Sequence, residues 1–198
     1  MKTTKISTGI IIGITGLAGS GKDTAAVELI STSGVYQYAF ARPMKEAAKL
    51  LMGWTDEHVH GKLKDVIDPL YGVSPRYVLQ TLGTEWGRSI IHKGLWTLRA
   101  ERFIESCRKL NADCNIVITD VRFDNEAAFI KEAGGIVLEV IRPDRYAQLD
   151  TGMAGAAEHT SEGGVHDKYV DARICNDGTV EELHQLVGSV LAQLGVHL

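Results

Sequence analysis

The stretch Gly16-Leu17-Ala18-Gly19-Ser20-Gly21-Lys22-Asp23-Thr24 decides the fold, because it has the spacing of a phosphate-binding loop. An apolar, β-branched run at 9–15 precedes it and indicates a buried strand, whereas 24–30 is typical of a helix. Strand, glycine-rich turn and helix form the context that such a loop requires. The alternative, a glycine-rich turn that carries a surface lysine, accounts for neither flanking element.

The residue types of this loop follow from the chemistry of phosphate binding. Glycines allow a tight turn and bring backbone N–H groups close to phosphate oxygens. The helix N-terminus adds unpaired donors and a positive dipole end. Lys22 supplies a mobile charge for the β- and γ-phosphates and is a catalytic candidate. The residues expected to hold the phosphates of a nucleotide here are Gly16, Ala18, Gly19, Ser20, Gly21, Lys22, Asp23 and Thr24.

Two places in the sequence raise the question of a metal. A Ser or Thr hydroxyl usually follows the loop lysine and binds Mg²⁺, but here Asp23 stands there and Thr24 follows. Either the Asp23 carboxylate binds the metal, directly or through water, or Thr24 supplies the hydroxyl one position later. His58 and His60 are two residues apart with no third ligand, which favours an exposed loop over a metal site.

The composition is that of an ordinary globular domain. The chain has 198 residues, 44% of them hydrophobic and 23% charged, enough for one core with a small insertion. A formal net charge of −4 argues against a nucleic-acid or membrane-surface partner. Cys107, Cys114 and Cys175 lack metal-ligand spacing and indicate a reducing, cytoplasmic environment.

Strand-like and helical segments alternate, which predicts an α/β domain with a mostly parallel sheet. Beyond the first strand, strands are expected at 35–41, 115–119, 136–141 and 173–176, and helices at 43–51, 75–82, 95–110, 125–133 and 180–194. The charged segment 53–94 is predicted to be an inserted substrate-binding region. Segment 143–168 is predicted to be a lid, or else a disordered loop. The core is then expected at 9–52, 95–142 and 169–198.

Asp120 and Arg122 come just after the strand expected at 115–119. Ligands of open parallel sheets bind beyond the carboxyl ends of the strands, so both side chains are expected near the phosphate loop. A carboxylate there can hold Mg²⁺ or accept a proton, and an arginine can bind a phosphate through two hydrogen bonds. Both are catalytic candidates, and Asp120 is also a candidate metal ligand. The alternative is a structural ion pair.

The segment 76–88 combines side chains that suit a nucleotide. Arg76 and Gln80 are four residues apart and share a helix face. Thr84, Trp86 and Arg88 follow a glycine on an expected turn. Guanidinium, amide, hydroxyl and indole groups can contact phosphate, base edge, sugar and base face. Taken alone, the tryptophan suits a core position equally well, and the second arginine suits a solvated surface.

The expected lid and its borders carry further polar groups, namely Arg142, Arg145, His159 and Ser161. Arginines on a closing lid can stabilise the charge that develops on a transferring phosphoryl group. Arg142 is therefore a fourth catalytic candidate. Each of these residues is also consistent with a solvated loop.

Four motifs, in this order, resemble the deoxynucleoside monophosphate kinases of tailed bacteriophages. They are GSGKDT at 19–24, LQTLGTEWGR at 79–88, ITDVRFDNEA at 118–127 and HTSE at 159–162. The first motif is shared by a large class, and the middle two are more specific. The resemblance covers about 10–179 and implies a three-layer P-loop kinase fold related to adenylate kinase. Such a fold has a five-stranded, mostly parallel sheet, an inserted helical region for the monophosphate, and a lid.

The resemblance also implies an activity and its participants. Such kinases transfer the γ-phosphoryl group of ATP to a deoxynucleoside 5′-monophosphate, with Mg²⁺ as cofactor and small molecules as partners. Residues implied to contact the monophosphate are Arg42, Arg76, Gln80, Thr84, Trp86, Arg88, Asp120, Arg122, Glu126, Arg145, His159 and Ser161. Asn176 begins the loop that packs beside adenine in such kinases. Arg42 stands where the family would have an acidic residue, so it binds the acceptor phosphate or replaces a carboxylate that contacts sugar or metal.

Two other functions are compatible with the phosphate loop. One is a different small-molecule kinase, of the dephospho-coenzyme A or phosphomevalonate type. The other is an ATP-binding switch module that acts through a protein partner. ATP turnover that depends on a monophosphate acceptor separates these functions. A homodimer is left open.

Overall fold

The computed structural model describes residues 9–144 and 164–198, which divide into two compact units. Unit 1 consists of the described residues up to Ala39 and from Ala100 onward, and unit 2 is Phe40–Arg99. Unit 2 extends further than the insert expected at 53–94. Helix α2 (Arg42–Met52), expected in the core, belongs to unit 2 because it packs against α3 and α4 of that unit.

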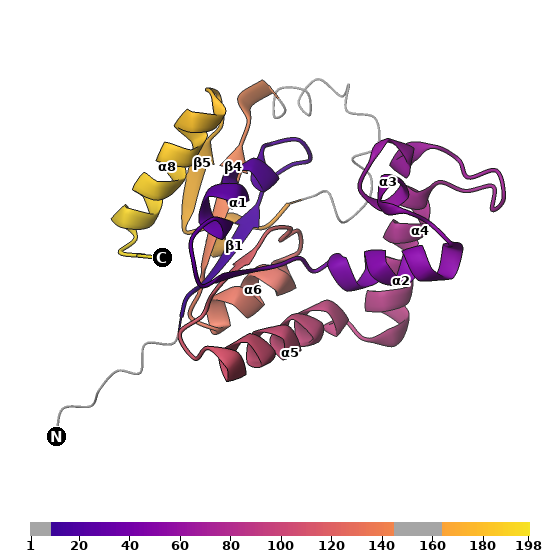
Figure 1. The fold of residues 1–198 in the computed structure, drawn as a ribbon, viewed down its shortest axis with the longest axis horizontal. Coiled ribbons are helices and arrows are strands. Elements are labelled where there is room, and N and C mark those ends of the chain that lie inside the picture. Colours follow the sequence, from indigo (N-terminus) through magenta and orange to yellow (C-terminus); the bar gives the residue numbers. More distant parts are fainter. Residues whose placement is uncertain (1–8, 145–163) are drawn as a thin grey trace. The chain divides into compact units, whose positions relative to one another are not determined.

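A five-stranded parallel sheet forms the centre of unit 1 (Figure 1). Its spatial order is β2-β3-β1-β4-β5, and every neighbouring pair is parallel. The strands are β1 (Ile11–Thr15), β2 (Val35–Tyr38), β3 (Asn115–Ile118), β4 (Ile136–Ile141) and β5 (Ala172–Cys175). All residues of the central strand β1 are buried, which explains its uninterrupted apolar run. The expected sheet is confirmed, with small shifts at strand ends.

Helices cover both faces of this sheet, as the expected three-layer fold requires (Figure 1). Helices α1 (Lys22–Ile30) and α8 (Val180–Gln193) contact each other and share one apolar core with the strands. Helix α6 (Asp124–Glu132) packs against β1 and β4 so closely that a Cβ at Gly13 would lie 2.5 Å from Ile130 Cδ1. Helix α5 (Leu95–Leu110) ends in unit 1, and a short 3₁₀ helix, η4 (Asp167–Tyr169), precedes β5.

Unit 2 is helical and has its own small core of Ala48, Trp54, Val59 and Leu79. Besides α2, its elements are α3 (Asp56–Val59), the 3₁₀ helix η1 (Lys62–Asp65), α4 (Pro75–Thr81) and the π-helix η2 (Leu82–Ile91). The predicted start of α4 is confirmed, because Ser74 Oγ accepts a hydrogen bond from the backbone N–H of Tyr77. The turn predicted after residue 82 is wrong, because η2 continues directly from α4.

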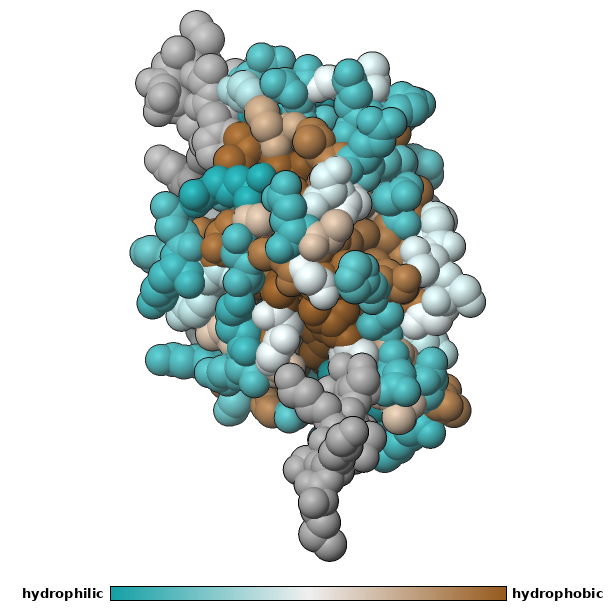
Figure 2. All heavy atoms as spheres, turned by 90° about the vertical axis from the view of Figure 1, so that its left-hand side faces the viewer, coloured by the Kyte–Doolittle hydropathy of each residue, from teal (hydrophilic) through white to brown (hydrophobic). Residues whose placement is uncertain are grey.

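Figure 2 views the molecule from the side on which α8 lies and shows apolar side chains gathered among polar ones. On α8 itself, Val180 and Leu186 stay exposed, as does Leu194 directly after the helix. The strand β5 lies at one edge of the sheet. Among the described residues, no helix combines the length and the apolar character needed to cross a membrane.

Candidate active site

The phosphate loop turns between β1 and α1 with a left-handed backbone at each of its three glycines. The φ angles are 139° at Gly16, 74° at Gly19 and 101° at Gly21. Helix α1 begins at the next residue, so the N–H groups of its first turn adjoin the loop. A Cβ at Gly21 would lie 2.3 Å from Asn176 Nδ2. Both the backbone angles and the close packing therefore require glycine, as the sequence predicted.

Lys22 reaches back across the loop. Its Nζ donates hydrogen bonds to the carbonyl oxygens of Gly16 at 2.8 Å and Leu17 at 2.6 Å. Lys22 and Arg122 line the same small hollow beside the loop. The sheet explains this meeting, because β3 lies next to β1 and the N–H of Val121 donates to the carbonyl of Ile14 at 3.1 Å. The predicted approach of Arg122 to the phosphate loop is thus present in unit 1.

The turn from β3 into α6 carries the other residues of this motif. Asp120 is half-buried directly after β3. Glu126 is 1% exposed, and its Oε2 accepts hydrogen bonds from the backbone N–H groups of Arg122 at 2.8 Å and Phe123 at 3.2 Å. A buried carboxylate needs such donors. Glu126 therefore stabilises the turn that carries Arg122, and its contact with a monophosphate stays a prediction.

Asp124 links the start of α6 to the segment before η4. Its Oδ1 accepts a hydrogen bond from the backbone N–H of His166 at 2.9 Å, and its Oδ2 lies 2.7 Å from His166 Nδ1. The backbone hydrogen bond from His166 holds the pKa of Asp124 below its ordinary value of 3.8. This contact attaches residue 166 to the helix that follows Arg122.

The lowered pKa of Asp124 predicts a pH dependence of stability. A carboxyl group with a depressed pKa in the folded state contributes stability above its ordinary pKa, and this stability is lost as the pH falls through the folded value. Between about pH 5 and pH 3, the Tm of the wild type should therefore fall more steeply than that of Asp124→Asn. Thermal melts followed by circular dichroism measure this, with Asp113→Asn, an exposed turn residue, as control. Parallel slopes for wild type and Asp124→Asn would contradict the prediction.

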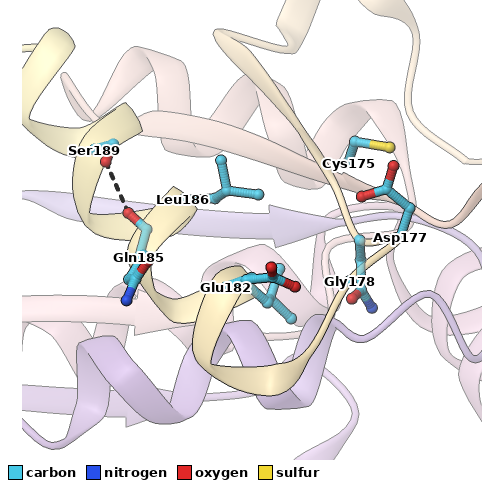
Figure 3. A pocket seen from close by; sticks show the side chains of 9 residues that line it. Cys175, Asp177, Gly178, Glu182, Gln185, Leu186 and Ser189 are labelled. Atoms are coloured by element: carbon cyan, nitrogen blue, oxygen red, sulfur yellow. Dashed lines mark hydrogen bonds between the residues drawn. The ribbon is translucent and has the colours of Figure 1, made fainter.

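Asn176 joins the end of β5 to the phosphate loop. Its Nδ2 donates a hydrogen bond to the carbonyl oxygen of Ser20 at 2.8 Å. Beyond it, an open hollow of about 650 Å³ lies between the loop after β5 and helix α8. Figure 3 shows Cys175 and Asp177 on the loop side of this hollow, and Gln185 and Leu186 on the helix side. The residue expected beside adenine is therefore held against the phosphate loop.

In unit 2, Arg76 is already engaged by a carboxylate. Its Nε and Nη2 donate to the two oxygens of Asp65, the second at 3.1 Å. The hydrogen bond from Arg76 holds the pKa of Asp65 below its ordinary value. Asp65 was missed by sequence reasoning, because nothing in the charged segment 62–65 singles it out. An acceptor phosphate that binds Arg76 has to share or replace this carboxylate.

The π-helix arranges the remaining residues of segment 76–88. Thr84 and Arg88 are four apart and half-buried, whereas Trp86 lies between them in sequence and is 45% exposed. In a helix with i→i+5 bonds, residues four or five apart share a side, and residues two apart do not. The structure therefore groups Thr84 with Arg88 and directs Trp86 elsewhere on η2.

The other predicted residues have the following places. Gln80 lies in α4, Arg42 is exposed at the first residue of α2, and Arg142 is exposed directly after β4. Arg145, His159 and Ser161 lie outside the described residues. Unit 1 thus carries the phosphate loop, Asp120, Arg122, Arg142 and Asn176 at or just after the carboxyl ends of its strands. Unit 2 carries the predicted residues from Arg42 to Arg88.

The predicted metal ligands fit what Mg²⁺ requires. Asp23 is exposed in the first turn of α1, Thr24 is half-buried beside it, and Asp120 is half-buried after β3. Mg²⁺ keeps several waters and needs only one or two protein oxygens in addition to substrate phosphates. No group of three His, Cys, Asp or Glu side chains that could hold a metal ion occurs in 9–144 and 164–198.

His58 lies in a short helix and His60 in the exposed turn that follows it, so the exposed loop predicted for the pair is correct for His60 and wrong for His58. His58 belongs to α3, where its Nδ1 lies 3.2 Å from the backbone N of Thr55, and its ring stacks on Trp54 at 5.9 Å between centroids. Nδ1 of His60 lies 3.2 Å from Lys45 Nζ. Burial and the Lys45 charge lower the pKa of His60. Their positions follow from helix capping and packing within unit 2.

Comparison with known proteins gives consistent matches. Residues 58–187 match the family described as deoxynucleotide monophosphate kinase. A protein of Acanthamoeba polyphaga mimivirus described as "Putative deoxynucleotide monophosphate kinase" is 34% identical, covering 90% of this chain and 94% of its own. The deoxynucleoside-5'-monophosphate kinase of Escherichia phage T5 is 27% identical, covering 84% and 89%. A Janibacter sugar kinase structure resembles the fold with a TM-score of 0.50 at 13% identity, covering 95% of both chains.

Proposed function

Because the chain belongs to the deoxynucleotide monophosphate kinase family, we propose that it transfers the γ-phosphoryl group of ATP to a deoxynucleoside 5′-monophosphate, releasing ADP and the diphosphate. One observation carries the proposal. Lys22 of the phosphate loop and Arg122 after β3 line one hollow beside the loop, so two basic residues adjoin the place where a phosphate on the loop would lie. The two viral relatives bear names of this activity.

On the donor side, the loop backbone and the N-terminus of α1 bind the phosphates of ATP. The residues that form this cradle are Gly16, Ala18, Gly19, Ser20, Gly21, Lys22, Asp23 and Thr24. The adenine lies beside Asn176 and the loop that follows it. The hydrogen bond from Asn176 to Ser20 supports this assignment, because it couples the base-side loop to the phosphate loop.

On the acceptor side, the monophosphate is bound by Arg76, Gln80, Thr84, Trp86 and Arg88 of unit 2, with Arg42 as a further candidate. The shared side of Thr84 and Arg88 on η2 supports a joint contact with one ligand. Asp120, Arg122 and Glu126 of unit 1 contribute from the turn after β3, and Arg142, Arg145, His159 and Ser161 from the segment after β4.

Oxygens of Asp23 or Thr24 and of Asp120 would hold Mg²⁺, which would neutralise negative charge on the phosphates of ATP. In the transfer itself, an oxygen of the acceptor phosphate forms a bond to the γ-phosphorus. The bond from that phosphorus to the β–γ bridging oxygen breaks, and its electron pair leaves with ADP. Lys22, Arg122 and Arg142 stabilise the charge in the transition state. No side-chain nucleophile is needed, so the buried Cys107 and Cys114 take no part.

The working environment follows from the same chemistry. Its partners are ATP and the monophosphate, small anions that loop amides and arginines recognise, and not nucleic acid or a membrane surface. The three cysteines are free thiols, which suits the reducing cytoplasm of a host cell.

The experiment that tests the function is a coupled assay of ADP release with Mg-ATP. It compares dAMP, dGMP, dCMP and dTMP, the four ribonucleoside counterparts, dephospho-coenzyme A and phosphomevalonate. We expect turnover with one or more deoxynucleoside monophosphates and none without an acceptor. ATP turnover that ignores the acceptor would instead indicate a switch module, and turnover only with one of the last two compounds would indicate another kinase.

A further inference from the structure

The π-helix η2 carries the residues assigned to the acceptor, and its geometry is unusual. It extends over Leu82–Ile91 and ends with an i→i+5 hydrogen bond from the N–H of His92 to the carbonyl oxygen of Gly87 at 3.0 Å. Helices of this kind are rare and mostly one turn long, and they occur often at functional sites. A π-helix of this length therefore needs contacts outside its own backbone to hold it.

Trp96 supplies such contacts from the first turn of α5. Its side chain is 7% exposed, and its indole Nε1 donates a hydrogen bond to the carbonyl oxygen of Gly83 at 2.9 Å. The same indole fills the space beside Gly87, where a Cβ would lie 2.7 Å from Trp96 Cζ2. Gly83 and Gly87 are four residues apart, so one ring contacts successive turns of η2 on the same side.

We propose that Trp96 is a positioning residue for the acceptor site: through Gly83 and Gly87, it holds η2 in its π geometry and thereby fixes Thr84 and Arg88. This inference rests on the proposed function, because it concerns the site to which the monophosphate is assigned. A return from i→i+5 to i→i+4 bonding would rotate every residue that follows it about the helix axis. Loss of the contacts of Trp96 with Gly83 and Gly87 should then weaken acceptor binding and leave ATP binding unchanged.

The test is Trp96→Phe, which keeps an aromatic ring and removes the N–H donor. We expect KM for the best deoxynucleoside monophosphate to rise roughly 2- to 10-fold, as the loss of one hydrogen bond predicts. KM for ATP should stay at the wild-type value. The difference between the two constants is the decisive readout, because a general loss of stability would not affect one substrate alone.

Unit 2 offers a matched control in Trp54. This second tryptophan is 6% exposed, and its Nε1 donates a hydrogen bond, at 2.6 Å, to Asp68 Oδ2 and not to a carbonyl oxygen of η2. Trp54→Phe removes a comparable buried hydrogen bond from the same unit. We expect it to lower Tm as Trp96→Phe does, with KM for the monophosphate unchanged.

A second variant tests the contact with Trp96 from the side of η2. Gly87→Ala places a methyl group against the indole of Trp96, at 2.7 Å, and against the carbonyl oxygen of Leu82, at 2.9 Å, so it disturbs the same part of η2 and should also raise KM for the monophosphate alone. Its control is Gly188→Ala in α8, where an added Cβ meets nothing within 4 Å. Gly87→Ala serves in place of Trp96→Phe if the Trp96 variant does not fold.

The inference fails if Trp96→Phe and Gly87→Ala leave KM for the monophosphate no higher than their controls do. It also fails if both substrate constants rise together. A wild-type enzyme that accepts no deoxynucleoside monophosphate would instead contradict the proposed function, and the assay of the wild type reveals this before any variant is made.

Discussion

Replacement of Lys22 by alanine is expected to lower kcat about 100- to 1,000-fold, the usual cost of losing one preorganised charge at a transferring group. The ammonium lies at the loop, where it donates to the carbonyls of Gly16 and Leu17, and it lines the hollow that Arg122 shares. When ATP binds, the same flexible side chain can exchange these carbonyls for phosphate oxygens. A charge that acts on the transition state affects kcat more than KM.

The fold should survive this substitution. Lys22 is half-buried at the first residue of α1, and its two hydrogen bonds contribute about 1 kcal/mol each. The measurement is steady-state kinetics with Mg-ATP and the best acceptor, together with a thermal melt. Lys109→Ala, at an exposed position in the last turn of α5, is the control and should retain full activity. A kcat near the wild-type value in Lys22→Ala would exclude this ammonium from the transfer step.

The second large effect is expected for Gly16→Ala. The backbone φ of Gly16 is 139°, an angle that a residue with a side chain adopts only under strain. An added Cβ would also lie 2.3 Å from the carbonyl oxygen of Val140. That oxygen belongs to β4, whose register with β1 pairs Ile14 with Leu138, so it cannot retreat without disturbing the sheet. Strain and overpacking together should cost about 3 kcal/mol or more and lower Tm by roughly 6–12 °C.

Activity should be lost as well in Gly16→Ala, because the displaced loop no longer presents its N–H groups to the phosphates. Gly34→Ala is the matched control. Its φ is also positive, at 85°, but an added Cβ meets nothing within 4 Å. It should lose only a few degrees of Tm, from strain of about 1–2 kcal/mol, and keep its kcat. Equal losses of stability in the two variants would show that the contact with β4 contributes nothing.

The sequence by itself determined the sheet and the phosphate loop. The apolar run of β1 is readable because a central parallel strand is buried on both faces. The glycines at 16, 19 and 21 are readable because their spacing permits the positive φ angles that the turn requires. The place of Arg122 also followed, since the end of a parallel strand beside β1 lies at the same edge as the loop. Each of these signals is local or follows from a general rule of topology.

The tertiary structure alone decided how the acceptor segment folds. Sequence reasoning expected a turn after residue 82, because glycines at 83 and 87 interrupt the helical pattern. The segment instead forms a π-helix against Trp96, and a contact across nine or more residues leaves no mark in local propensity. The structure also gives Glu126 a role that the sequence did not predict, because its buried carboxylate accepts hydrogen bonds from the backbone of the Arg122 turn. Its capping role was hidden because Phe123, not Ser or Thr, precedes the helix.

The pairing of Arg76 with Asp65 was also decided by the tertiary structure. Neither residue type nor spacing predicts it, because η1 and α4 bring the two charges together only once unit 2 is packed. The extent of unit 2 was decided in the same way, by the contacts of α2 with α3 and α4. The conformation of the phosphate loop and the burial of the strands follow from short stretches of sequence. Side-chain partners depend on which distant elements fold against each other, and that information lies in the packing.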